Sequence, residues 1–401
     1  MPSKIEWTGE TWNPIAGCSI VSPGCTNCYA MRMAARIERM SPGLEHYRDL
    51  TKPSKAGPVW TGNVALAPER TLLEPLRRKK PTTWFVNSMS DLFHEDVPDG
   101  WIMHVLDVIF RTPHHTYQVL TKRSARMRDF MARWADLSGE DFEPKLVRGP
   151  DETRKAHPSG RGQLFAAYLD TLFEMSGGKV PAGAAWPTFD WMGGMIGWPS
   201  FPGNLWLGVS CERQQEADAR IPDLLATPAA VRFVSAEPLL GPVDFTRIRG
   251  TTCLATSGSC CGGRTQVDAL RGIQFCERAG AYAFPGKTGM PKGLDWIIVG
   301  GESGPGARPM HPDWARAIRD QCAAAGTAFF FKQWGEWAWS DDGVTYTDAA
   351  TTWGNQRFPR GTHLEHHSCG RTAFRVGKKA SGRLLDGRTH DAYPERALET
   401  V

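Results

Sequence analysis

The chain has 401 residues, of which 22% are charged and 41% hydrophobic, and its formal net charge at pH 7 is +4. These values are typical of a globular protein with a large core, and they exclude a disordered composition. No stretch approaches the ~18 apolar residues of a membrane span, and the N-terminus lacks the apolar core of a signal peptide. We therefore expect a cytoplasmic protein without membrane contact, whose ten cysteines are thiols or metal ligands.

Three cysteines near the N-terminus form the pattern C-x6-C-x2-C at Cys18, Cys25 and Cys28. Glycine, proline and asparagine residues between them are typical of a loop, which disfavours buried core thiols. Three thiolates without an adjacent fourth suit a four-iron, four-sulfur cluster that keeps one iron open for a ligand. A zinc site completed by a distant Cys or His fits the same spacing, so the motif alone leaves both metals open.

Short apolar runs alternate with helical patterns along the chain. Strands are expected at 84–86, 116–120, 205–209, 231–234, 296–299 and 328–331, after a first strand before Cys18. Helices are expected at 29–40, 101–110, from Ser124, at 214–225 and at 312–325. This alternation predicts an α/β fold, a partial or complete (β/α) barrel of about six to seven βα units. No dinucleotide-binding G-x-G-x-x-G follows the first strand, which disfavours an open sheet.

Two insertions and a tail interrupt the alternation. Residues 135–203 are rich in Gly, Pro and charge around one helix near 164–173, and residues 246–293 contain four further cysteines. These are Cys253, Cys260, Cys261 and Cys276, a possible second metal (zinc) site whose spacing lacks two C-x2-C pairs. We expect a barrel-like catalytic domain over 1–345 and an irregular basic segment over 346–401.

The basic character of the tail has two interpretations. Residues 357–401 contain nine Lys or Arg against five Asp or Glu, an excess equal to the net charge of the whole chain. This excess is typical of contacts to phosphates. It is equally typical of a solvated segment that covers the domain.

Polar residues follow each predicted strand, at the edge where (β/α) barrels place their active sites. A single one is usually a helix cap, but a ring of them around one mouth is costly without a ligand. The residues that we single out at these ends are Ser88, Asp91, Lys122, Glu212, Glu237 and Glu302.

Several segments carry a resemblance to a known family. They are Trp12-Asn13-Pro14 with the cysteine motif, 85–93, 119–123, 299–304, 331–335 and 382–387. Together they resemble a phage- and prophage-associated family of three-cysteine-motif proteins, which in turn is similar to the radical S-adenosylmethionine enzymes. The resemblance covers most of the chain apart from the two insertions.

The resemblance implies a cofactor and roles for the residues. It implies that Cys18, Cys25 and Cys28 bind a 4Fe-4S cluster, whose open iron binds S-adenosylmethionine through its amino and carboxylate groups. An external electron donor would then lead to a 5′-deoxyadenosyl radical. The strand-end residues become candidates for binding the cofactor or substrate.

The motif departs from the radical enzymes in its spacing. They have C-x3-C-x2-C with an aromatic residue before the third cysteine, whereas here six residues fill the first gap and Asn27 precedes Cys28. Their Gly-Gly-Glu cofactor contact follows the second strand. The Gly-Gly-Glu of this chain lies late, at 300–302, so its role is not transferred.

The leading hypothesis is thus a cluster-dependent radical enzyme, and the phage association together with the basic tail favours a nucleic acid base or nucleotide as its substrate. A second hypothesis is a zinc-stabilised nucleic-acid-binding protein without catalysis, which would use the cysteines of 253–276 and the tail. A third is a metal-free barrel hydrolase in which Glu237 and Glu302 form a carboxylate pair.

Overall fold

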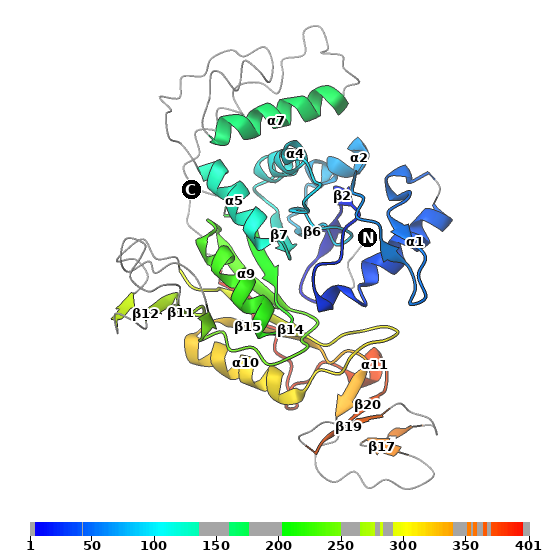
Figure 1. The fold of residues 1–401 in the computed structure, drawn as a ribbon, viewed down its shortest axis with the longest axis vertical. Helices are drawn as coiled ribbons and strands as arrows, with labels where there is room; N and C mark the ends of the chain where they lie inside the picture. Colours follow the sequence, from blue (N-terminus) through cyan, green and yellow to red (C-terminus); the bar gives the residue numbers. More distant parts are fainter. Residues whose placement is uncertain are drawn as a thin grey trace. The chain divides into compact units, whose positions relative to one another are not determined.

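A computed structural model describes residues 5–41, 43–135, 160–175, 203–249, 265–276, 281–283, 292–339, 351–353, 356–358, 364–366 and 370–395 (Figure 1). The chain forms two compact units. The first comprises Met1–Ile20, Ala30–Val209 and Asp223–Arg232, and the second comprises Val21–Tyr29, Ser210–Pro222 and Phe233–Val401. Each unit therefore carries part of the cysteine motif, Cys18 in the first and Cys25 with Cys28 in the second.

The principal sheet has seven strands in the order β1-β6-β7-β8-β9-β14-β15. Their bounds are β1 (Glu10–Trp12), β6 (Thr83–Val86), β7 (Thr116–Thr121), β8 (Leu205–Ser210), β9 (Val231–Ala236), β14 (Trp296–Gly300) and β15 (Ala328–Gln333). The pairs β1–β6, β6–β7, β7–β8, β9–β14 and β14–β15 are parallel. This confirms the predicted α/β class. Because β1 and β15 end the strand order, the described strands correspond to a partial barrel.

The first unit packs helices against strands that are buried on both faces. Its helices are α1 (Tyr29–Met40), α2 (Glu69–Leu72), α3 (Glu74–Arg77), α4 (Asp99–Phe110), α5 (Ser124–Ala135) and α7 (Gly160–Met175). Every residue of β8 is buried, as its continuous apolar run predicts for a central parallel strand. Trp12 and Trp84 are also buried.

Helices α4 and α7 approach closely at Gly100. A Cβ atom there would lie 2.2 Å from the carbonyl oxygen of Ala167, so only glycine allows this packing. Tyr168 of α7 donates a hydrogen bond to Asp107 of α4 over 3.1 Å. Burial raises the pKa of Asp107 to about 6. It lowers the pKa of His104 to about 4, and neither ring nitrogen of His104 has a hydrogen-bond partner among the described residues.

The second unit contains α9 (Gln214–Ala226), whose last turn belongs to the first unit, together with α10 (Pro312–Ala325) and α11 (Lys378–Ser381). Helix α10 starts where the sequence dictates, since His311 caps its N-terminus and Pro312 occupies its first turn. It ends at Gly326, whose φ of 72° is the left-handed conformation that glycine adopts without strain.

Shorter elements complete the fold. An antiparallel sheet consists of β10 (Ile248–Arg249), β11 (Thr265–Asp268), β12 (Ile273–Cys276) and β13 (Ala281–Ala283), and a second of β16 (Trp337–Trp339), β20 (Thr372–Arg375) and β19 (Leu364–His366). The remaining pairs are β2 (Ile15–Ala16) with β5 (Ala65–Leu66), β3 (Thr51–Lys52) with β4 (Val59–Trp60), and β17 (Thr351–Trp353) with β18 (Gln356–Phe358). Two 3-10 turns lie at Pro23–Cys25 and Glu45–Tyr47.

The predicted strands all lie within observed strands, and the first strand before Cys18 is β1. Helices 29–40 and 312–325 have the predicted bounds. Of the insertion 135–203, α7 is described, and of 246–293 the strands β10 to β13 are. Cys253, Cys260 and Cys261 lie outside the described residues, while Cys276 ends β12, so the zinc site there stays a prediction. The boundaries of the domains and insertions also stay predictions.

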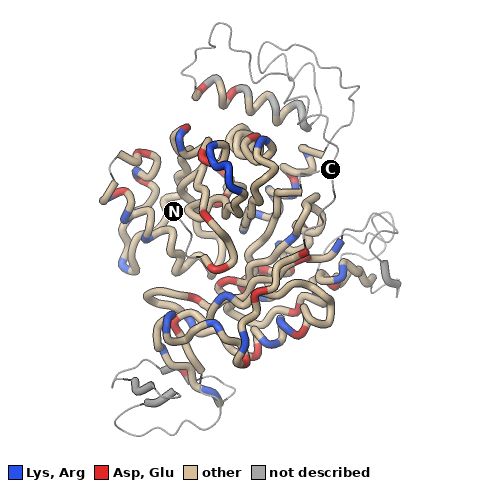
Figure 2. Tube along the Cα trace, turned by 180° about the vertical axis from the view of Figure 1, so that it is seen from behind, with Lys and Arg blue, Asp and Glu red and all other residues tan. Residues whose placement is uncertain are grey.

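Several basic residues of the tail are engaged within the second unit. Arg371 contacts the carboxylate of Asp313 at 3.2 Å, and Arg375 donates to the carbonyl oxygen of Gly304 over 3.0 Å. Figure 2 shows basic and acidic residues interspersed along the trace. Both interpretations of the tail stay predictions. Among the helices of the described ranges, none combines the length and the apolar character that crossing a membrane requires.

Candidate functional site

In the first unit, residues after β6 hold the chain that leads to Cys18. The backbone N–H of Asn87 donates to the carbonyl oxygen of Trp12 over 2.8 Å, and its side-chain oxygen accepts from the N–H of Ile15 over 3.2 Å. Asn87 adopts a φ of 59°, which asparagine tolerates better than most residues. Ser88 donates to the side-chain oxygen of Asn13 over 3.0 Å. Ser88, predicted to bind a cofactor or substrate, thus supports the segment before the motif.

Gly17, directly before Cys18, is confined on the same side. Its φ is +94°, and a Cβ atom there would lie 2.1 Å from the carbonyl oxygen of Asn63. Its N–H donates to the carbonyl oxygen of Met89 over 3.2 Å. Only glycine tolerates both the positive φ and the close approach of Asn63, so glycine at this position fixes the backbone directly before Cys18.

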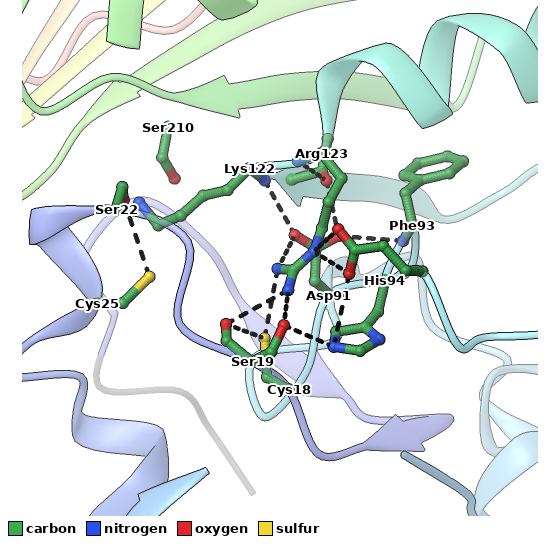
Figure 3. Close-up of polar contacts among 12 residues, drawn as sticks. Cys18, Ser19, Ser22, Cys25, Asp91, Phe93, His94, Lys122, Arg123 and Ser210 are labelled. Atoms are coloured by element: carbon green, nitrogen blue, oxygen red, sulfur yellow. Dashed lines mark hydrogen bonds and ion pairs between the residues drawn. The ribbon is translucent and has the colours of Figure 1, made fainter. Parts of the chain in front are cut away.

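Asp91 is saturated by hydrogen bonds from its own surroundings (Figure 3). Its carboxylate accepts from the N–H of Phe93, the hydroxyl of Thr121, the N–H of Lys122 and the guanidinium of Arg123, over 3.0, 2.6, 2.9 and 3.1 Å. The side chain is 7% exposed. Asp91 therefore joins the ends of β6 and β7, and Lys122 takes part in this joint through its backbone.

Arg123, which the sequence analysis did not single out, lies beside Cys18. One guanidinium nitrogen is 3.4 Å from the Cys18 sulfur and also contacts Asp91, while the other donates to the hydroxyl of Ser19 over 2.6 Å (Figure 3). Burial lowers the pKa of Arg123, but Asp91, Cys18 and Glu95 together raise it above its usual value. The structure thus places a permanent, mostly buried cation next to a thiol of the motif.

The contact between Ser19 and His94 is not a nucleophile–base pair. The two side chains are 2.9 Å apart, but the other ring nitrogen of His94 accepts a hydrogen bond from the N–H of Asp96 over 3.2 Å. The nitrogen facing Ser19 consequently carries the proton and donates it, and burial lowers the pKa of His94, which keeps the ring neutral. His94 therefore positions Ser19 and does not activate it.

In the second unit, Glu212 holds the first half of the cysteine loop. Its carboxylate, fully buried, accepts from the Ser22 hydroxyl over 2.7 Å and from the Arg220 guanidinium over 2.9 Å. A Cβ atom at Gly24 would lie 2.2 Å from the same carboxylate. The Ser22 hydroxyl is also 3.8 Å from the sulfur of Cys25. Glu212 thus anchors the loop that carries Cys25, and its role in binding a cofactor or substrate stays a prediction.

Glu302 holds the second half in the same way. Asn27 donates to its carboxylate over 3.1 Å and to the carbonyl oxygen of Gly306 over 2.9 Å. Arg308 binds the carboxylate through two nitrogens, over 2.6 and 2.8 Å, and donates to the carbonyl oxygen of Pro23 over 2.9 Å. The residue before Cys28 is therefore asparagine because its amide bridges two acceptors on the loop after β14.

Glu237 has a different partner. Its carboxylate is 3.2 Å from the ammonium of Lys332 and accepts from the Ser235 hydroxyl over 3.1 Å. Glu237 and Glu302 each have a cation of their own, Lys332 and Arg308 respectively. The hydrolase hypothesis, in which these two carboxylates act as a pair, stays a prediction.

The thiols of Cys18, Cys25 and Cys28 are not in disulfide bonds, and Cys25 is buried while the other two are half-buried. Within the described ranges, no three His, Cys, Asp or Glu side chains are grouped closely enough to hold a metal ion. Because Cys18 lies in the first unit and Cys25 and Cys28 lie in the second, their assignment as ligands of one metal centre stays a prediction from spacing. The donor set itself, three thiols with one adjacent cation, fits an iron–sulfur cluster.

Sequence reasoning missed the residues that hold the loop, namely Ser22, Asn27, Arg123, Arg220 and Arg308. One signal was present, because Asn27 replaces the aromatic residue of the radical enzymes. A small amide at that position indicates that the loop is held by hydrogen bonds and not by packing.

The family model for a protein of unknown function (DUF5131) matches residues 2–394. The chain belongs to this family. No curated protein and no solved structure matches the chain. The family description names no activity or cofactor, so the phage association and the relationship to radical S-adenosylmethionine enzymes stay predictions.

Proposed function

We propose that this DUF5131 protein binds a 4Fe-4S cluster through Cys18, Cys25 and Cys28 and acts as a radical S-adenosylmethionine-type enzyme. The observation that carries the proposal is the support of the cysteine loop. Two mostly buried carboxylates, Glu212 and Glu302, accept hydrogen bonds from the side chains of Ser22 and Asn27, near the two ends of the cysteine loop. A surface loop that only connected two elements would not need buried charges to fix it.

The chain's own residues would perform three tasks at this centre. Gly17 and the residues after β6 fix the backbone before Cys18. The guanidinium of Arg123, 3.4 Å from the sulfur of Cys18, would offset the negative charge of a thiolate ligand. Hydrogen bonds to ligand sulfurs raise the reduction potential of iron–sulfur clusters, so Arg123 would also set how readily the centre accepts an electron.

Glu212 and Glu302 would keep the loop of Cys25 and Cys28 in place. Because each carboxylate already accepts hydrogen bonds from an arginine and from a loop side chain, neither is expected to bind the cofactor itself. When bound, the cluster and S-adenosylmethionine would supply the radical chemistry, which belongs to the cofactor and not to the protein.

Iron loading of single-cysteine variants tests the ligand assignment. We expect anaerobically purified wild-type protein to hold about four irons per chain, the content of one such cluster. Cys28→Ala should lose most of this iron, because a cluster with two protein thiolates is poorly held. Cys322→Ala is the matched control, since Cys322 is buried in α10 and is not in a disulfide, and it should load iron like the wild type.

Two results would contradict the proposal. Full iron content in Cys28→Ala would show that Cys28 is not a ligand. Wild-type protein that holds zinc, and no iron after anaerobic reconstitution, would favour the zinc-stabilised binding protein. In that case the damaging substitutions should fall among the cysteines of 253–276.

A further inference from the structure

Glu237 and Lys332 form an ion pair that spans one strand of the sheet. Glu237 follows β9 directly and Lys332 lies near the end of β15, while β14 runs between these two strands. The carboxylate and ammonium are 3.2 Å apart, and the two side chains are 13% and 19% exposed. Since neighbouring strands are about 4.8 Å apart, the two side chains bridge a distance of roughly two strand spacings.

The intervening strand is built to let them meet. β14 ends at Gly300, where a Cβ atom would lie 2.3 Å from the carboxylate oxygen of Glu237. Any other residue at this position would displace the carboxylate. Glycine at position 300 therefore leaves the space that the carboxylate of Glu237 occupies at the end of β14.

The ammonium of Lys332 is poorly satisfied compared with the arginines nearby. It has three N–H donors, and Glu237 is its one partner among the described residues. The guanidinium of Arg308, by contrast, makes three hydrogen bonds to Glu302 and Pro23. A mostly buried ion pair recovers its desolvation cost only when further hydrogen bonds complete it. The remaining N–H donors of Lys332 are available to a ligand.

The charge of the pair defines the ligand. The pair is neutral as a whole, so a ligand with a net charge would leave an unbalanced charge in a mostly buried place. A zwitterion avoids this because its carboxylate can bind Lys332 while its ammonium binds Glu237. We propose that Glu237 and Lys332 bind the α-amino-acid group of a substrate. The inference concerns a ligand of the function proposed above and rests on it for the reaction.

Calorimetric titration of the full-length, metal-free chain tests this inference. The probes are the common L-amino acids, S-adenosylmethionine, 5′-methylthioadenosine, which lacks the amino-acid group, and nucleoside monophosphates. We expect an α-amino-acid probe to bind, and Lys332→Met to weaken that binding at least about tenfold, as the loss of a charge-assisted hydrogen bond implies. Binding by an L-amino acid would support the inference, whereas binding by S-adenosylmethionine alone would overturn it and would favour a cofactor site.

Two further variants keep the test independent of folding. Gly300→Ala retains both charges but displaces Glu237, and it should weaken the same probe. Lys292→Met is the matched control, because Lys292 pairs with Asp295 at 2.6 Å in the same unit but is 76% exposed, and it should bind the probe like the wild type. Circular dichroism of each variant shows whether it is folded.

The inference would be overturned if no α-amino-acid probe bound the wild type, or if Lys332→Met bound such a probe unchanged. Binding of a nucleoside monophosphate that depended on Lys332 would also overturn it and would favour a nucleotide substrate. Iron analysis of the wild type separates the two proposals. Lys332-dependent binding of an amino acid to a protein that cannot load iron would refute the proposed function alone.

Discussion

Two kinds of buried charge lie at the strand ends of the second unit, and they differ in how fully their polar atoms are paired. Glu212 and Glu302 accept hydrogen bonds from arginines and from side chains of the cysteine loop. Lys332 has Glu237 as its one partner within the described part of the chain. The fully paired carboxylates hold the protein's own loop, whereas the sparsely paired lysine retains donors for a ligand.

The difference shows that burial of a charge does not by itself identify a ligand contact. A saturated carboxylate is a structural element even when it lies where a barrel places its active site. The number of donors and acceptors that remain is the more informative property. The two classes should therefore respond differently to substitution.

The largest effect is expected for Glu212→Ala. The substitution leaves the buried guanidinium of Arg220 without its carboxylate, which typically costs about 3–5 kcal/mol of unfolding free energy. Glu45→Ala is the control, because Glu45 and Arg48 are exposed and 3.8 Å apart, and its loss should stay below about 1 kcal/mol. Urea denaturation measures both. Equal losses in the two variants would contradict the role of Glu212 as an anchor.

Two buried titratable residues of the first unit, His104 and Asp107, can be tested by measuring the free energy of unfolding as a function of pH. The pKa of His104 is lowered to about 4 from 6.5, so its contribution is complete above pH 6.5 and is lost as the pH falls toward 4. The pKa of Asp107 is raised to about 6 from 3.8, so its contribution is complete below pH 3.8 and is lost as the pH rises toward 6. Each contribution amounts to about 3 kcal/mol, and the two slopes oppose each other.

The contributions of these two groups to wild-type stability should consequently offset each other between pH 4 and 6. In His104→Leu only the pH dependence due to Asp107 remains, so the free energy of unfolding should fall by about 3 kcal/mol as the pH rises from 4 to 6. In Asp107→Asn only the pH dependence due to His104 remains, so the free energy of unfolding should rise over the same pH range. Denaturation midpoints measured at several pH values provide the comparison, and identical profiles for all three proteins would refute the assignment.

Gly24→Ala should have an intermediate effect. The new Cβ atom would meet the carboxylate of Glu212 at 2.2 Å, which forces a shift that typically costs about 1–3 kcal/mol. The loop should move with it and iron loading should decrease. Gly43→Ala is the control, because a Cβ atom at Gly43 would meet nothing within 4 Å. Thermal unfolding and iron analysis measure the two consequences, and unchanged iron content in Gly24→Ala would contradict the importance of the contact.

The smallest effect on stability is expected when both members of the sparsely paired group are replaced. Removing a mostly buried ion pair together, as in Glu237→Leu with Lys332→Met, is often nearly neutral, so we expect a change below about 1 kcal/mol. Binding of the α-amino-acid probe should nevertheless be lost. A large loss of unfolding free energy in the double variant would show that the pair stabilises the fold, and the comparison above would fail.

The sequence predicted the elements better than the contacts of the site. Strands such as 296–299 were recognised because parallel strands buried on both faces have continuous apolar runs. The role of Glu212 could not be recognised from the sequence, because its partner Ser22 lies 190 residues away in the chain. A strand-end carboxylate shows where charge is placed, but the donors that saturate it depend on tertiary packing. For the same reason Lys122 was predicted to bind a ligand, while its neighbour Arg123 provides the side chain beside Cys18.

The central claim is tested most directly by the electron paramagnetic resonance spectrum of the reduced, anaerobically purified protein, recorded with and without S-adenosylmethionine. We expect the spectrum of a reduced 4Fe-4S cluster that changes when S-adenosylmethionine is added, because one iron lacks a protein ligand. A silent, colourless protein that holds zinc, or a cluster spectrum that S-adenosylmethionine leaves unchanged, would contradict it.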